Sequence, residues 1–109
     1  HPFRTSINPH HKFKMPFDKI KDKIAAIECF NARMLPGDNN KADRIADNLN
    51  IAKTGGSDTH FKFEVATAYT LFNGNLRKAL KDKATKADGT IKYGPFGGLL
   101  SFLRNRIIG

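Results

Sequence analysis

The sequence is poor in cysteine and has no long apolar run, and each shortage excludes a class of protein. Cys29 is the single cysteine among 109 residues, so the chain cannot form an internal disulfide. A lone thiol fits a reducing compartment, and we therefore expect a cytoplasmic protein. No apolar run approaches the ~20 residues that a transmembrane helix needs. We accordingly expect no membrane partner.

Two familiar binding signatures are also missing. The spacing His-x-His, a common metal-binding pair, occurs nowhere in the chain. His10 and His11 are adjacent, and they lie in a proline-containing segment, residues 1–16, for which we expect a loop with a solvated turn. The segment "GPFGG", residues 94–98, has the glycines but not the lysine of a phosphate-binding P-loop. We interpret it as a turn before a last helix.

Positive charge, in contrast, is in excess. Nineteen lysines and arginines face ten acidic residues, which gives a formal net charge of +9. A field of that sign attracts phosphates, whether on a phosphorylated small molecule, a nucleotide or a nucleic acid. Lysines gather near residues 12–23 and 77–86. These lysines have two alternative interpretations. The chain is a basic module that binds nucleic acid without catalysis, or the lysines simply form a solvated surface.

The length allows one small domain, residues 1–109, and the hydrophobic pattern predicts strands that alternate with helices. Apolar spacing predicts a helix from residue 17, a helix over 42–49 capped by Asp38 or Asn39, and a lysine-coated helix over 76–84. Short strands are expected at 27–30, 51–58 and 66–72. The last helix, 99–108, is expected to bury Leu99, Leu100, Leu103 and Ile107. We interpret residues 86–98 as a loop.

This alternation is typical of an α/β fold with a parallel sheet and flanking helices. Asp58 and His60 follow the glycine-ended strand "AKTGG", and we expect alternation along the strand to place both side chains on one face. Ligands of parallel α/β folds bind beyond the carboxyl ends of the strands. A carboxylate and an imidazole there are two plausible ligands for Zn, Mn or Fe.

Four segments, in order, resemble motifs of one family: "HPFR" (1–4), "AIECFNAR" (26–33), "NKADRIADNLNIAKTGGSDTH" (40–60) and "FEVATAYTLF" (63–72). They are similar to the polymerase and histidinol phosphatase (PHP) superfamily, and most of all to its small phosphoesterases. The resemblance covers residues 1–72, the motif-bearing part. Residues 73–109 are then a carboxyl-terminal helical extension.

The resemblance implies a partial, incomplete TIM-like PHP barrel and hydrolysis of phosphate esters by a metal-activated water. It implies a divalent metal (Zn, Mn or Fe) held by His1, Asp58 and His60. It also implies contacts of Arg4, Asn31 and Arg33 with the substrate phosphate. The identity of the catalytic residues stays unknown.

The family pattern also requires an amino-terminal His-x-His, further histidines and a glutamate, all ahead of "HP". The chain therefore resembles the carboxyl-terminal part of a PHP domain. We expect it to be inactive alone and to need an amino-terminal half or a second copy.

Six further positions have structural alternatives. Glu28 is expected to face the pocket or to support it from the strand edge, and Glu64 to cap or orient a neighbour. Cys29 is expected to be a core residue, because no base is near it in sequence. The rings of Phe61, Phe63 and Phe72 are expected to pack.

Overall fold

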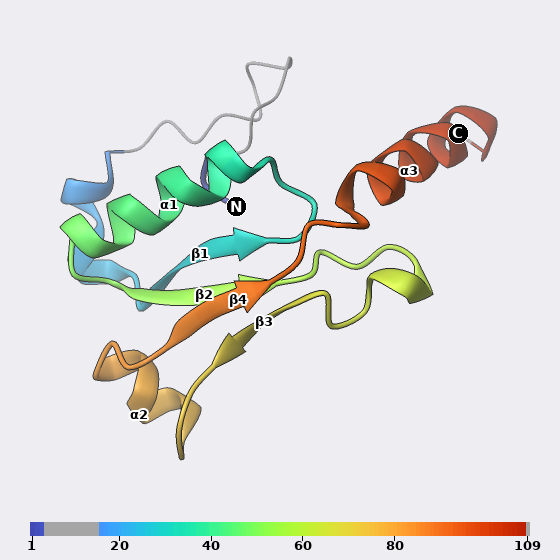
Figure 1. Cartoon of the computed structure of the whole chain (residues 1–109). Helices are drawn as coiled ribbons and strands as arrows, with labels where there is room; N and C mark the ends of the chain where they lie inside the picture. The colour runs from blue at the N-terminus through green and yellow to red at the C-terminus, as the bar shows by residue number, and fades with distance from the viewer. Residues whose placement is uncertain (4–15, 109) are drawn as a thin grey trace.

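The computed structural model describes residues 1–3 and 16–108. Its regular elements, in chain order, are β1 (Ala26–Asn31), α1 (Pro36–Asn48), β2 (Ala52–Gly56), β3 (Ala68–Leu71), α2 (Leu76–Lys81), β4 (Lys86–Gly89) and α3 (Gly94–Ile108). Short 3-10 turns cover Phe17–Lys19, Lys21–Lys23 and Lys62–Glu64. Figure 1 shows α1 lying across one face of the strands, while α3 extends away from them.

The unit β1–α1–β2 confirms the expected parallel pairing. Strands β1 and β2 run parallel, from Ala26 opposite Ala52 to Asn31 opposite Gly56. Helix α1 buries two alanines on these strands, and small side chains allow such a close approach. The resulting core cluster consists of Ile27, Cys29, Ala42, Ala46 and Ile51. Burial of this apolar surface is the main force that joins helix and strands.

The second half of the chain differs from the expected parallel sheet, because β3 and β4 form an antiparallel pair. Residues 86–89 were expected at the start of a loop, since they lack the β-branched and aromatic residues typical of strands. Pairing with β3 overrides that local preference. The proposed division of the chain at residue 72 stays a prediction, although β4 pairs with β3 across it.

The two pairs of strands lie against each other. The Thr70 hydroxyl accepts a hydrogen bond from the Gly55 backbone N–H (3.0 Å) and donates one to the Gly55 carbonyl oxygen (3.2 Å). The Thr85 hydroxyl donates to the Lys53 carbonyl oxygen over 2.7 Å. Across residues 1–3 and 16–108 the strands form two two-stranded sheets and no closed barrel. The fold is therefore α/β, as expected, but a barrel is not seen.

Three predictions about helices were wrong. The segment from Phe17 forms two 3-10 turns rather than one helix. Helix α1 starts at Pro36, whose fixed φ suits a first helical position, so neither Asp38 nor Asn39 is its cap. The "GPFGG" segment is the first part of α3 rather than a turn.

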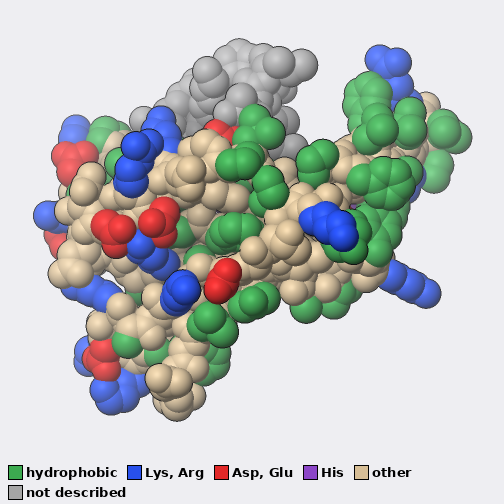
Figure 2. Space-filling model, viewed as in Figure 1, with side chains coloured by type: hydrophobic (Ala, Val, Ile, Leu, Met, Phe, Trp, Pro, Cys, Tyr) green, Lys and Arg blue, Asp and Glu red, His purple; other side chains and the backbone are tan. Residues whose placement is uncertain are grey.

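The apolar side chains of α3 are largely exposed, contrary to the prediction. Leu99 is 54% exposed and Ile107 is 82% exposed, and Figure 2 shows the hydrophobic side chains gathered over this helix. Its contacts with the body include those of buried Gly94 and Gly97, of Ser101, which accepts a hydrogen bond from Arg33, and of Arg104, which lies over the Phe61 ring. Among residues 16–108, no helix combines the length and the apolar character that crossing a bilayer demands.

Gly55 permits the close approach of β2 to β3, because a Cβ there would meet the Tyr69 carbonyl oxygen. We expect Gly55→Ala to lower the free energy of unfolding by about 2 kcal/mol, as strands must move to relieve the overlap. The control is Gly37→Ala in α1, where a Cβ meets nothing within 4 Å. That variant should be neutral or stabilised by up to about 1 kcal/mol. Urea denaturation measures both, and equal stabilities would contradict this packing.

Candidate functional site at the carboxyl ends of the parallel strands

Asp58 and His60 lie together in the loop that follows β2. The strand ends at Gly56 and Asp58 has a left-handed backbone (φ 51°), so the loop, rather than strand alternation, brings the two residues together. His60 Nδ1 lies 2.8 Å from the Asp58 carbonyl oxygen and 3.6 Å from Asp58 Oδ1. A carbonyl only accepts, so Nδ1 carries a hydrogen. In the neutral imidazole, Nε2 then keeps a lone pair that can bind a metal.

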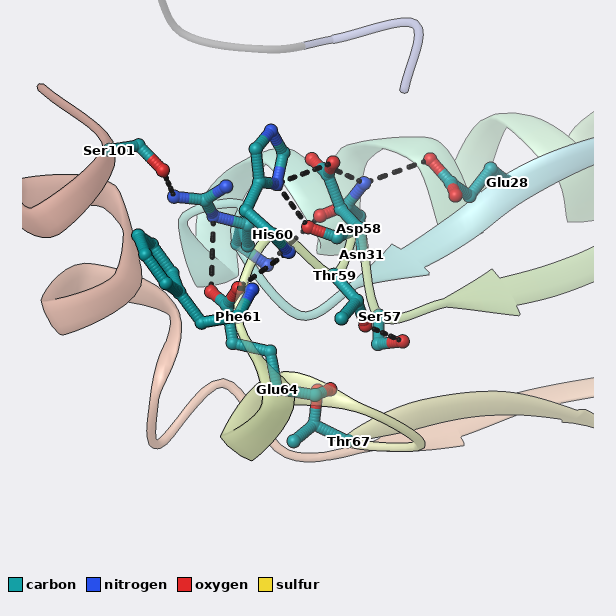
Figure 3. Close-up of polar contacts among 11 residues, drawn as sticks. Glu28, Asn31, Ser57, Asp58, Thr59, His60, Phe61, Glu64, Thr67 and Ser101 are labelled. Atoms are coloured by element: carbon teal, nitrogen blue, oxygen red, sulfur yellow. Dashed lines mark hydrogen bonds and ion pairs between the residues drawn. The ribbon is translucent and has the colours of Figure 1, made fainter. Parts of the chain in front are cut away.

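Asn31, at the end of β1, connects Asp58 to a second carboxylate. Its side-chain Nδ2 lies 3.2 Å from Glu28 Oε2 and 3.4 Å from Asp58 Oδ2, as Figure 3 shows. The Asn31 amide thus donates to both carboxylates and holds them on the same side of the strand ends. Glu28 therefore faces this site, one of the two positions expected for it.

The position of Asn31 is fixed by Asn39 of α1. Asn39 Oδ1 accepts from the Asn31 backbone N–H (3.0 Å), and Asn39 Nδ2 donates to the Asn31 carbonyl oxygen (3.1 Å). Both residues are buried. The sequence contains a signal for this role: Asn39, Ala42 and Ala46 share the i, i+3, i+7 stripe of α1. A polar residue on a buried stripe needs a hydrogen-bonding partner.

Glu64 anchors the loop that carries His60. Its side chain is almost fully buried, at 1% exposure for the residue. Glu64 Oε2 accepts hydrogen bonds from the backbone N–H groups of His60 (2.8 Å) and Phe61 (3.0 Å). The expectation that Glu64 orients a neighbour is confirmed. The bond to Phe61, three residues earlier, is the glutamate half of a capping box.

Arg33 pairs with this buried carboxylate. Arg33 Nε lies 3.3 Å from Glu64 Oε1, and the arginine side chain is only 8% exposed. Its Nη2 donates to Ser101 Oγ of α3 over 2.9 Å. The guanidinium therefore joins the His60 loop to α3. Gly97 leaves room for this pair, because a Cβ there would meet Glu64 Oε1.

His1 lies beside Glu28 rather than in a three-ligand group with Asp58 and His60. Its α-amino group is 3.3 Å from Glu28 Oε2, and its Nδ1 accepts from the Phe3 backbone N–H at 3.2 Å. Its Nε2 is buried and has no hydrogen-bond partner among the described residues. Residues 1–3 and 16–108 contain no group of three or more His, Cys, Asp or Glu side chains that could hold a metal. Arg4, His10 and His11 lie outside the described residues.

Cys29 is a core residue, as expected, and its surroundings keep the thiol neutral. The sulfur lies 3.4 Å from the Ile27 carbonyl oxygen and 3.6 Å from that of Ala42. Burial raises the pKa of the Cys29 thiol from 9.0 to about 12, and the Asp43 carboxylate adds to the rise. A thiol with so high a pKa is a poor nucleophile at neutral pH.

Comparison with known families identifies the central part of the chain. Residues 36–87 match the profile of the PHP-associated family, PHP_C. This segment runs from α1 to β4 and includes Asp58, His60 and Glu64. It is a PHP-associated carboxyl-terminal domain, and the resemblance to PHP proteins is confirmed. No curated protein and no solved structure matches the chain.

The buried Arg33–Glu64 pair leads to a stability prediction. We expect Glu64→Gln to lower the free energy of unfolding by about 3 kcal/mol, because Arg33 is left as an uncompensated buried charge. The control is Asp82→Asn, which breaks the exposed pair of Asp82 with Lys78. That change should cost less than about 1 kcal/mol. Urea denaturation at pH 7 compares them, and similar losses would show that burial does not strengthen the Arg33–Glu64 pair.

The raised pKa of Cys29 gives a pH prediction. The unfolded thiol loses its proton near pH 9 and the folded thiol near 12. The contribution of Cys29 to stability is therefore complete below pH 9 and is lost as the pH rises toward 12. Between pH 8 and 11, the unfolding free energy of the wild type should fall more steeply than that of Cys29→Ala. If the unfolding free energies of the wild type and Cys29→Ala fall equally with pH, the raised pKa of Cys29 is contradicted.

Proposed function

We propose that Asp58 and His60 are ligands of the divalent metal centre of a PHP-type phosphoesterase. Two observations support this assignment: the match to the PHP-associated family over residues 36–87, and the adjacency of these side chains at the carboxyl end of β2. Carboxylate oxygen and imidazole nitrogen are suitable ligands for Zn, Mn and Fe. The assignment of His1 to the same metal stays a prediction.

The donor set fits a metal only in part. Two ligands come together in the described residues, whereas a catalytic zinc site usually has three protein ligands and one open position. We propose that a further PHP segment, in the same protein or in a partner subunit, supplies the others. When bound, such a metal polarises phosphoryl oxygens and activates water.

The residues of this chain would then have distinct tasks. His60 offers Nε2, because its Nδ1–H is held by the Asp58 carbonyl oxygen. Asn31 restrains the Asp58 carboxylate, and Glu64 fixes the backbone of His60. Arg33 would reach a substrate phosphate only by giving up Glu64 and Ser101, so we propose that it positions the loop. Of the other two predicted phosphate contacts, Asn31 lies in the site, and the role of Arg4 stays a prediction.

Metal titration tests this proposal. Calorimetry with MnCl2 or ZnCl2 should show one site per chain, and His60→Ala or Asp58→Asn should weaken binding at least tenfold. The control is His11→Ala, a histidine outside the proposed ligand set, which should leave the affinity unchanged. Hydrolysis of p-nitrophenyl phosphate by this chain alone should be slow. Equal affinity in the wild type and His60→Ala would overturn the ligand assignment.

A further inference from the structure

A groove lies at the opposite end of the parallel strands from Asp58 and His60. It has a volume of about 940 Å³ and lies between α2, the end of α1 and the start of β2. Figure 1 shows α2 at the end of the sheet where β1 and β2 begin. The six residues of β1 separate the two regions by roughly 17 Å. We call it the amino-end groove, and it shares no residue with the candidate metal site.

The floor of the amino-end groove is aliphatic. The apolar side chains that line it include Ile24, Leu49, Ile51, Leu76 and Leu80. Among the described residues that line it there is no aromatic ring, so these residues offer no surface on which nucleic-acid bases could stack. Its volume lies in the range of small-molecule sites. These features favour a ligand with an aliphatic body.

The rim of the groove is basic. Among the described lining residues, the charged ones are Lys21, Arg77, Lys81 and Lys83, with Asp22 as the one acid. The four cations come from the two lysine-rich parts of the sequence, which the fold brings together. They form no ion pair with another described residue. Lys53, in contrast, pairs with Asp43 and Asp47 over 2.8 Å each. Such unpaired charges beside an apolar surface favour an anionic head group.

We propose that the amino-end groove binds an organic anion with an aliphatic body and a phosphate or carboxylate head. The aliphatic body lies on the leucine and isoleucine floor, where its apolar surface is removed from water. The head lies at the basic rim, near Arg77 and Lys81. Arginine suits either head group, because its guanidinium matches the geometry of both oxyanions. This role is separate from the proposed metal centre.

Four probes separate the contributions of body and head. Dodecyl phosphate and dodecanoate, each below its micelle concentration, should bind one per chain in calorimetry. Dodecanol lacks the charge and inorganic phosphate lacks the body, so each should bind at least tenfold more weakly. Whichever of the two anions binds with the higher affinity identifies the preferred head group. Dodecanol binding as tightly as dodecyl phosphate would overturn the proposal.

Variants locate the binding. Arg77→Glu and Lys81→Glu should each weaken dodecyl phosphate binding at least tenfold, whereas Leu76→Ser should weaken dodecyl phosphate and dodecanoate alike. All three positions are exposed, so the fold should survive, as a thermal melt of each variant checks. The matched control is Lys92→Glu, an exposed lysine outside the groove, which should bind as the wild type does. An equal loss in Lys92→Glu would contradict a specific site.

Two further measurements separate this proposal from its rivals. Asp58→Asn should bind dodecyl phosphate as the wild type does, even if it no longer binds Mn²⁺. The groove proposal can therefore be tested even if the proposed metal site proves wrong. A loss of dodecyl phosphate binding in Asp58→Asn would contradict separate sites. A single-stranded oligonucleotide should not displace dodecyl phosphate. If the oligonucleotide displaces dodecyl phosphate at low salt but not at moderate salt, the proposal is overturned and the ligand of the groove is a nucleic acid.

Discussion

The buried carboxylate of Glu64 is the group on which the candidate site depends. One oxygen accepts the backbone N–H groups of His60 and Phe61, and the other pairs with Arg33 at the end of β1. Arg33 also donates a hydrogen bond to Ser101, and so connects Glu64 to α3. A buried ion pair is a weak source of net stability, because both charges lose their water. Its strict geometry instead fixes the His60 loop relative to β1.

Backbone packing makes this arrangement possible. Gly97 leaves space for the Glu64 carboxylate, and Gly94 lets α3 approach the backbone of Ala32. On the other side, Asn39 fixes the end of β1 through two hydrogen bonds. The polar groups at the strand ends thus depend on contacts from α1 and α3. The PHP-associated segment, residues 36–87, contains α1 but ends before α3.

The sequence predicted the part of the fold in which local pattern and tertiary packing agree. The stripe of α1 and the apolar run of β1 gave the parallel unit, and the order of motifs gave the family. The patterns failed where tertiary contacts override local preference. The sequence "KADG" became β4 only through pairing with β3. The apolar stripe of α3 predicted burial, but most of that stripe lies exposed in this chain.

The candidate site shows the same limit. Asp58 and His60 were found from their spacing, although the left-handed backbone at Asp58, and not a strand, brings them together. The partners of Arg33, Glu64 and Ser101, are far from it in the sequence, and no spacing rule predicts such contacts. The link from Asn39 to Asn31 is shorter, and its signal is a polar residue on the buried stripe of α1.

Native-state hydrogen exchange of the His60 and Phe61 amides tests the role of Glu64 most directly. Both amides belong to a surface loop, and they should nevertheless exchange slowly, since a buried carboxylate accepts both hydrogens. The amide of exposed Thr59 in the same loop should exchange fast. Exchange of His60 and Phe61 at the rate of an unfolded peptide would contradict this account.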